Sequence, residues 1–123
     1  MVHLMEACLL TALQAYLLGS LLFGVLVSKL FYHDDVRLHG SGNAGMTNAL
    51  RTYGVRSAAL VLAIDTLKTV LAVLLARLLL AEPWGTVVGG ACAVLGHDFP
   101  VYYRFRGGKG VLSSAVVVAL LDW

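Results

Sequence analysis

Two long apolar runs constrain the fold of this chain more than any other feature of its sequence. The first extends from Leu4 to Phe31 and the second from Ser57 to Ala81. Each is long enough to cross the hydrocarbon core of a bilayer as a helix, which takes about 20 residues. Charged residues make up only 13% of the 123, whereas soluble domains have about 25%. The chain is therefore predicted to be an integral membrane protein.

Two shorter apolar segments follow in the second half of the chain. We expect residues 86–99, extended past Pro100, to form a third span, in which three glycines allow close helix packing: Gly89, Gly90 and Gly96. Residues 111–121 begin a fourth span but are too few to cross a bilayer. The expected fold is an all-α, polytopic transmembrane helix bundle with three full spans and an incomplete fourth. Residues 1–123 would form one integral membrane domain with its C-terminal part missing.

The cations between the spans predict the orientation of the chain. Six of the nine lie in residues 32–56 and 102–110, namely Arg37, Arg51, Arg56, Arg104, Arg106 and Lys109. Because Lys and Arg concentrate in cytoplasmic loops, we expect both loops in the cytoplasm and the N-terminus outside. The same rule accounts for the basic clusters without a nucleic-acid partner. Residues 1–6 hold no Lys or Arg, so the first span is expected to be retained rather than cleaved as a signal peptide.

The first basic loop carries a dense set of glycines and polar side chains. Residues 37–51 have the sequence RLHGSGNAGMTNALR. Three glycines permit left-handed backbone angles, namely Gly40, Gly42 and Gly45. Successive amides in such a turn can cradle an anion, and a helix beginning near residues 44–47 would add its dipole. Arg51 would supply a planar, permanently charged fork for phosphate. A solvated, flexible loop with an Asn or Ser cap is an equally good interpretation.

The second basic loop, residues 104–110, places glycines around a lysine. Its sequence is RFRGGKG, so backbone amides can wrap an anionic oxygen while Lys109 supplies charge. A Walker A loop would need a glycine at Tyr103 and a Ser or Thr at Gly110, which excludes a P-loop ATPase. An ordinary cytoplasmic turn is the alternative. With both loops on one membrane face, the pattern predicts a site for a small phosphorylated molecule beside lipid.

Three ionisable residues stand out within the predicted spans. Asp65 and Lys68 are three positions apart, so they share one helix face and are expected to pair. A structural ion pair is favoured over the alternative in which Lys68 reaches an anionic substrate. His97 has no second histidine at ligand spacing, so neither a metal nor another cofactor is expected. From the residues alone, a structural role for His97 is favoured over a catalytic one.

Four segments between residues 15 and 111 resemble one enzyme family in their order and spacing. GSLLFGVLVSKL, RLHGSGNAGMTNALR, DTLK and GHDFPVYYRFRGGKGV resemble segments of the bacterial acyl-phosphate glycerol-3-phosphate acyltransferases, the PlsY family. The resemblance implies a polytopic enzyme of the bacterial inner membrane that acts in phospholipid biosynthesis. It would transfer a fatty acyl group from acyl phosphate to the 1-hydroxyl of glycerol 3-phosphate, forming lysophosphatidic acid without a cofactor. The implied partners are both substrates, membrane lipid and the soluble enzyme that produces acyl phosphate.

The resemblance also assigns roles to individual residues. Ser41 and Arg51 match essential positions of the family's first cytoplasmic motif and, with His97, are the expected catalytic residues. The expected substrate-binding residues are Asn43, Thr47, Asn48, Lys68, Gly107, Gly108, Lys109 and Gly110. Acyl phosphate is already an activated donor, so positioning and charge stabilisation account for catalysis without a covalent serine intermediate. We therefore expect Ser41 to act through hydrogen bonds.

One part of the family pattern has no counterpart in residues 1–123. The family has a third cytoplasmic motif, containing His, Asn and Glu, beyond a fourth span, so we expect this chain to be a fragment of a longer enzyme. The alternatives are a membrane transporter, a non-enzymatic anion-binding module and an inactive fragment. Spans interrupted by glycine and an intramembrane Asp–Lys pair would suit a transporter.

Overall fold

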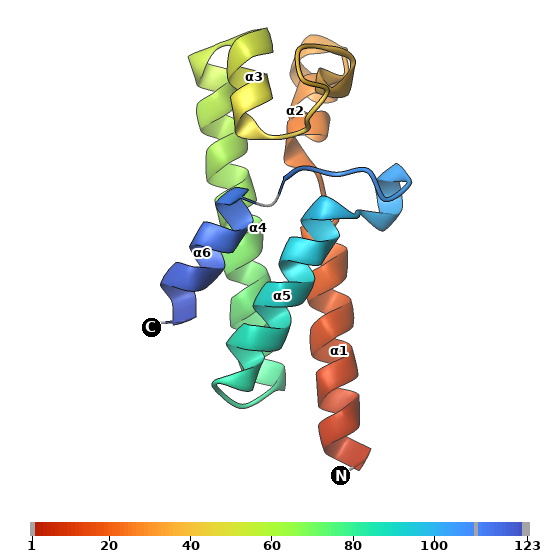
Figure 1. Cartoon of the computed structure of the whole chain (residues 1–123), viewed down its shortest axis with the longest axis vertical. Helices are drawn as coiled ribbons and strands as arrows, with labels where there is room; N and C mark the ends of the chain where they lie inside the picture. The colour runs from red at the N-terminus through yellow and green to blue at the C-terminus, as the bar shows by residue number, and fades with distance from the viewer. Residues whose placement is uncertain (1, 110, 122–123) are drawn as a thin grey trace.

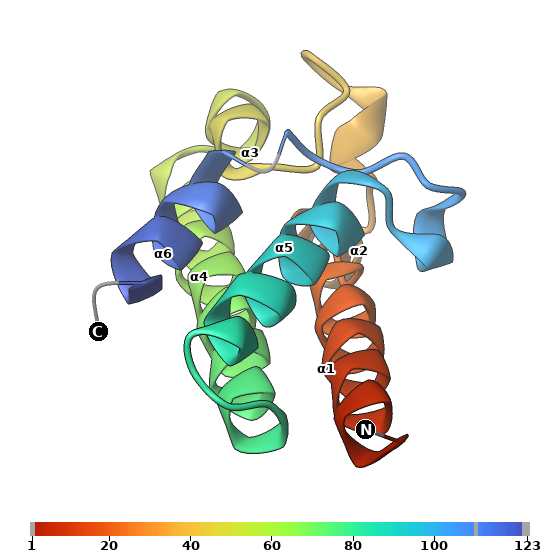
Figure 2. The ribbon, with the colours of Figure 1, turned by 60° about the horizontal axis from the view of Figure 1, so that its bottom comes forward.

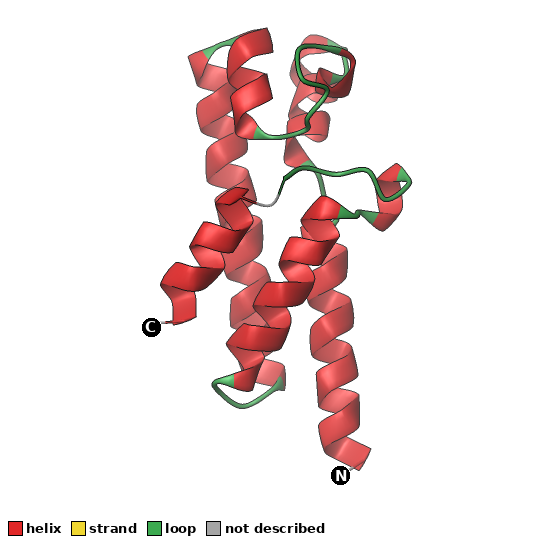
Figure 3. Ribbon diagram, in the orientation of Figure 1, coloured by secondary structure: helices red, strands yellow, loops and turns green. Residues whose placement is uncertain are grey.

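The computed structural model describes residues 2–109 and 111–121, and every regular element within them is helical (Figure 3). In chain order these elements are α1 (Val2–Gly19), α2 (Phe23–Tyr32), η1 (Val36–Leu38), α3 (Met46–Tyr53), α4 (Val55–Leu79), α5 (Trp84–Asp98), η2 (Val101–Tyr103) and α6 (Val111–Leu121). The predicted all-α architecture is confirmed. Gly110, one of the expected substrate-binding residues, lies outside the described residues.

The first apolar run forms two helices, α1 and α2, with a short break between them, and together they are long and apolar enough to cross a membrane as expected. Residues 20–22 separate α1 from α2. The hydroxyl of Ser20 donates to the carbonyl of Tyr16 at 2.8 Å, and Leu22 is extended with φ −92° and ψ 96°. The regular helical hydrogen bonding therefore stops at this point and resumes in α2.

Lys68 of α4 satisfies the carbonyls that the break releases. Its ammonium group donates to the carbonyl of Gly19 at 3.0 Å and to that of Leu21 at 2.7 Å. Within a bilayer such carbonyls need a partner from the protein, because lipid tails offer none. The predicted pair with Asp65 is also present, with Lys68 Nζ 3.5 Å from Asp65 Oδ1. Lys68 thus links the broken first span to the second.

Helices α1, α4 and α5 form the packed centre of the molecule, and α6 lies against α4 and α5 (Figure 2). Small residues allow the backbones to approach closely. A Cβ added at Gly19 would collide with the carbonyl of Ala93, and one at Gly96 with the carbonyl of Tyr16. The other two predicted glycines lie equally close to their neighbours, Gly89 against Ala76 and Gly90 against Val117. The expectation that glycines of the third apolar segment permit close packing is confirmed.

Enlarging Gly96 is expected to separate α1 from α5. We predict that Gly96→Val destabilises the folded chain by at least about 1–3 kcal/mol, the usual cost of overpacking, because the obstacle is backbone rather than a movable side chain. Ala91→Val supplies the matched control, since Ala91 lies on the exposed face of the same helix. Thermal unfolding in detergent micelles measures both variants. Equal stability of the two would contradict this packing.

The lengths of the helices differ considerably. Two helical segments among the described residues, His3–Tyr32 and Val55–Leu79, are long and apolar enough to cross a membrane. Helix α5 has 15 residues, about 22 Å at 1.5 Å per residue. It ends at Asp98, so its expected continuation past Pro100 is wrong. Proline has no N–H and disfavours a helical conformation of the residue before it, which explains the end.

The two polar loops lie toward the same end of the molecule. In Figure 1 the N-terminus and the turn between α4 and α5 are at the bottom, whereas α2, α3 and residues 33–45 are at the top. Residues 99–109 also face this upper half, although they lie lower than α3 because α5 is short. The chain thus brings both loops from distant parts of the sequence to one side of the bundle.

Candidate functional site

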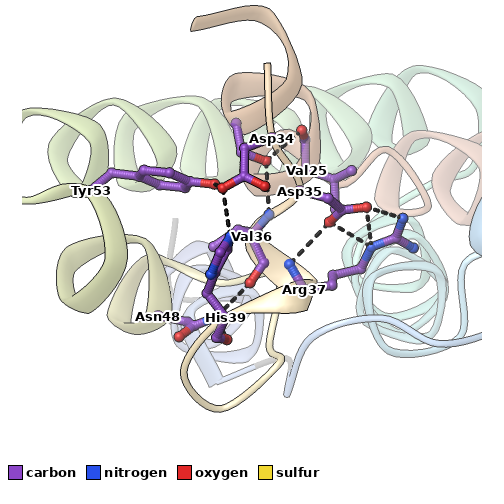
Figure 4. Close-up of polar contacts among 9 residues, drawn as sticks. Val25, Asp34, Asp35, Val36, Arg37, His39, Asn48 and Tyr53 are labelled. Carbon is purple, nitrogen blue, oxygen red and sulfur yellow. Dashed lines mark hydrogen bonds and ion pairs between the residues drawn. The ribbon is translucent and has the colours of Figure 1, made fainter. Parts of the chain in front are cut away.

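The first loop is built around the side chain of Asn48. Asn48 Nδ2 lies 2.9–3.0 Å from three backbone carbonyls, those of Val36, His39 and Asn43. Its Oδ1 accepts a hydrogen bond from the amide of Ser41 at 3.2 Å. The residue is only 1% exposed, so water does not compete for these bonds. The side chain of Asn48 ties the loop to α3 (Figure 4), which argues against the flexible-loop interpretation.

The glycines of this loop adopt two different conformations. Gly40 and Gly42 have φ values of 52° and 77°, in the left-handed region as expected. Gly45 is extended instead, with a φ of −88° and a ψ of 178°, because it is the residue that precedes α3. Its amide donates to Asn43 Oδ1 at 2.7 Å. Helix α3 begins at Met46, within the expected window of residues 44–47.

Two aspartates fix the other side of the loop (Figure 4). Asp35 accepts hydrogen bonds from the amide of Arg37 at 3.0 Å and from its guanidinium at 2.6 Å. The hydrogen bonds from Arg37 hold the pKa of Asp35 below its ordinary value. Asp34 accepts from the hydroxyl of Tyr53 at 2.9 Å. Burial, followed by this bond to Asp34, raises the pKa of Tyr53 to about 12, so its hydroxyl remains a donor at neutral pH.

The donor role of Asn48 can be tested with a near-isosteric pair of substitutions. Asn48→Asp replaces the two N–H donors by a second acceptor facing carbonyls, and each buried carbonyl left unpaired costs about 1–3 kcal/mol. We expect hydrogen exchange of the amides in residues 39–45 to rise at least tenfold. Asn43→Asp is the control, because Asn43 uses its side chain as an acceptor there. Unchanged exchange in Asn48→Asp would rule out this role.

The second loop folds back onto the C-terminal end of α5. The amide of Gly107 donates to the carbonyl of Asp98, and that of Gly108 to the carbonyl of His97, both at 3.0 Å. A Cβ at Gly107 would collide with the His97 carbonyl, and one at Gly108 with the His97 imidazole. Arg104 turns the chain with φ 55°. Glycines are therefore required here so that the loop can lie directly on His97.

A cavity of about 460 Å³ lies between the two loops and is lined by residues from six segments. The first loop and α3 supply polar groups, namely Ser41, Asn43, Thr47, Asn48 and Arg51. Lys109 enters from the second loop, His97 from α5 and Asp65 from α4. Arg51 and Lys109, which are 58 positions apart in the sequence, therefore border the same cavity. An apolar wall, formed largely by α6, completes the lining and consists of Met46, Val111, Leu112, Ser113 and Ala115.

The predicted site residues fall into two groups around this cavity. Seven of them line it, namely Ser41, Asn43, Thr47, Asn48, Arg51, His97 and Lys109. Gly107 and Gly108 are not among the lining residues and instead pack against His97. Lys68 is also placed behind the cavity lining, where its Nζ contacts His97 Nδ1 at 2.9 Å. The carbonyls of Gly19 and Leu21 are its other acceptors. These contacts fit the structural role, and the part of Lys68 in substrate binding stays a prediction.

Sequence reasoning missed the apolar wall of the cavity. The composition of residues 111–121 predicts the start of a span, but nothing in it distinguishes a substrate-facing side chain from a lipid-facing one. Ser113 offered a weak signal, because it is a polar residue in an apolar run; it is 2% exposed and accepts from Thr69 at 3.4 Å. Asp65 was expected to pair with Lys68, but its position in the cavity lining was not expected.

Comparisons with known proteins agree with this arrangement. Residues 9–123 match the glycerol-3-phosphate acyltransferase family. A relative of that name from Pseudomonas entomophila is 52% identical over 110 residues, which are 89% of this chain and 58% of the relative. Another, from Halalkalibacterium halodurans, is 44% identical over 119 residues, which are 95% of this chain and 58% of the relative. The chain therefore spans somewhat more than half the length of these curated relatives.

Solved structures show the same fold. The crystal structure of PlsY, an integral membrane glycerol 3-phosphate acyltransferase, in its glycerol 3-phosphate form matches with a TM-score of 0.83 and 39% identity. That match covers 94% of this chain and 57% of the other. The lysophosphatidic acid form gives a TM-score of 0.80 at 37% identity, with the same coverage. The likeness confirms an integral membrane fold, and together with the match over residues 9–123 it establishes that this chain belongs to the glycerol-3-phosphate acyltransferase family.

Proposed function

We propose that this chain transfers a fatty acyl group from acyl phosphate to the 1-hydroxyl of glycerol 3-phosphate and so forms lysophosphatidic acid. One observation carries the proposal: a single cavity is lined both by cationic, hydroxyl and amide groups and by an apolar wall. A phosphorylated polyol needs cations and hydrogen-bonding groups around it, whereas a fatty chain needs apolar surroundings. A cavity of this composition, at the edge of a bilayer, provides both.

Arg51 and Lys109 are the groups that hold phosphoryl oxygens in this proposal. The guanidinium of Arg51 can bind two oxygens at once, and the ammonium of Lys109 adds a compact charge. Ser41, Asn43 and Thr47 orient the substrates by hydrogen bonds from the same loop. Asn48 shapes the loop with the hydrogen bonds described above.

The reaction itself requires little from the protein beyond positioning. The oxygen of the 1-hydroxyl forms a bond to the acyl carbonyl carbon, and the bond from that carbon to the phosphate oxygen breaks. Phosphate leaves with the electron pair and the hydroxyl proton is released. Cations fixed beside the phosphate stabilise the charge that develops on it. No acyl-serine intermediate is needed because the donor is already activated.

The setting of the activity follows from the same proposal. Residues 1–123 act as one membrane domain whose basic loops, residues 32–56 and 102–110, lie in the cytoplasm and whose N-terminus lies outside. The inner membrane of a bacterium supplies the lipid, and phospholipid biosynthesis uses the product. A soluble enzyme that makes acyl phosphate is the expected supplier of the donor.

A radiochemical assay tests the proposed function. Membranes containing the chain receive palmitoyl phosphate and labelled glycerol 3-phosphate, and lysophosphatidic acid is separated by thin-layer chromatography. Membranes without the chain provide the background. We expect labelled lysophosphatidic acid together with release of inorganic phosphate. Uptake of label into sealed vesicles without acylated product would identify a transporter instead, and failure to bind glycerol 3-phosphate would identify an inactive fragment.

A further inference from the structure

The Lys68 ammonium lies at the centre of a buried polar row that crosses three helices. Lys68 and Asp65 come from α4, and His97 comes from α5; their exposed fractions are 4%, 4% and 6%. Lys68 Nζ lies 3.0 Å from Gly19 O, 2.7 Å from Leu21 O and 2.9 Å from His97 Nδ1. An ammonium group has three N–H donors and no acceptor. Its three hydrogen bonds are therefore directed to these three atoms.

The charge of Lys68 is supported by what surrounds it. Two carbonyl oxygens point at the nitrogen, and Asp65 Oδ1 lies 3.5 Å away. If Lys68 were a neutral amine, the Asp65 carboxylate would remain buried without a compensating cation, and such a group is strongly destabilising. An ammonium group thus fits the site better than an amine.

This arrangement determines which nitrogen of His97 carries the proton. Because the ammonium can only donate, His97 Nδ1 must accept. A neutral imidazole that accepts at Nδ1 carries its hydrogen at Nε2. His97 Nε2 is the atom nearest to a Cβ built on Gly108, and His97 lines the cavity that Arg51 and Lys109 border. The N–H of His97 is therefore on the side of the second loop.

We propose that Lys68 is a positioning residue that holds His97 neutral with its proton on Nε2, so that His97 donates a hydrogen bond to a phosphoryl oxygen in the cavity. This rests on the proposed function for the identity of the ligand. His97 in this arrangement cannot take the proton of the attacking hydroxyl at Nδ1, which Lys68 occupies. It acts as a fixed donor beside the two cations, and the Asp65–Lys68 pair maintains that state.

Nitrogen-15 NMR of histidine-labelled chain in micelles tests the tautomer directly. The His97 signal is identified by its loss in His97→Gln, and His3, whose side chain is 99% exposed beside Glu6, provides the signal of a solvent-exposed ring for comparison. We expect the proton on Nε2 at neutral pH, and a shift of that signal when glycerol 3-phosphate is added. A proton on Nδ1, or a doubly protonated ring, would overturn the proposal. This result needs no catalytic turnover, so it is separable from failure of the acyltransferase assay.

Substitutions of His97 and Lys68 test whether His97 acts as a hydrogen-bond donor or as a general base. Glutamine can place an N–H close to the position of His97 Nε2 but cannot exchange protons, so His97→Gln should keep acyl transfer within about tenfold. His97→Ala should lose about 10²–10³-fold, as expected for a lost oxyanion donor. His3→Gln is the matched control. Equal losses in His97→Gln and His97→Ala would refute the donor role. In Lys68→Met, the His97 signal should show a mixture of tautomers, whereas an unchanged signal would refute the positioning role.

Discussion

Arg51→Ala is expected to reduce acyl transfer by at least about 10²–10³-fold, the range seen when one charge-stabilising group is removed from an active site. Arg51 lies in α3 and lines the cavity from the side of the first loop. Arg51 is the one arginine among the described residues that line the cavity, so its loss would remove the two hydrogen bonds that we propose it makes to phosphoryl oxygens, as well as a charge. Binding of glycerol 3-phosphate, measured by calorimetry in micelles, should weaken about 10–100-fold.

Arg56→Ala controls for the general effect of removing an arginine near the cytoplasmic loops. Arg56 lies at the beginning of α4, is exposed and is not among the residues that line the cavity. Arg56→Ala should retain acyl transfer within about twofold of the original chain. A charge that does not contact the ligand acts on it mainly through electrostatic interactions that salt screens. Arg51→Lys adds a further comparison, because lysine preserves the charge but not the fork. If Arg51→Ala and Arg56→Ala had the same activity, the assignment of Arg51 to the phosphate would be wrong.

Lys68→Met is expected to destabilise the chain by about 3–5 kcal/mol, because it breaks a buried ion pair and leaves Asp65 uncompensated. The substitution also removes the donor to the Gly19 and Leu21 carbonyls, where the first span is interrupted. Methionine fills a similar volume, so the loss reflects polar interactions rather than a cavity. Unfolding by increasing dodecyl sulfate in mixed micelles gives the stability of the variant relative to the original chain.

A double substitution separates the charge from the carbonyl bonds. Asp65→Leu combined with Lys68→Met removes both charges, and such replacements are often neutral or stabilising elsewhere. Here the two carbonyls would still lack a donor, so we expect stability between that of Lys68→Met and that of the original chain. Complete recovery would mean that Lys68 contributes nothing at the break in the first span. If the free energy of unfolding of the single variant Lys68→Met were within 1 kcal/mol of that of the original chain, the interpretation of the buried polar row around Lys68 would be wrong.

The elements and most of the cavity-lining residues could be predicted because local features determine them. Apolar runs placed α4 and α5 within a few residues of their observed bounds, and a change from glycine-rich to helix-forming sequence placed the start of α3. Ser41, Asn43 and Arg51 were identified because polar side chains are dense there, and they line one cavity. Their roles in binding and catalysis stay predictions.

Features that depend on distant contacts could not be predicted. Residues 20–22 contain one polar residue, Ser20, and a single serine in an apolar run does not predict a break. The donor that satisfies the Leu21 carbonyl at the break is Lys68, 47 positions away in the sequence. The contact between His97 and Lys68 likewise joins α5 to α4 across a crossing that sequence spacing does not reveal. Gly45 could have been left-handed like Gly40 and Gly42, but its place before α3 makes it extended. A glycine in a loop permits several conformations, and its neighbours select one of them.

The shortness of α5 has a consequence for the surrounding lipid. A 15-residue helix of about 22 Å is shorter than a hydrocarbon core of about 30 Å, so we expect residues 99–109 to draw polar headgroups inward on one flank of the protein. Hydrophobic mismatch of this kind costs fractions of a kcal/mol per ångström and thins the adjacent leaflet. An amphiphile in this dimple would have its headgroup level with Lys109 while its tail stayed among neighbouring lipids. When the chain is reconstituted into bilayers of increasing acyl length, the free-energy cost of hydrophobic mismatch should therefore rise progressively.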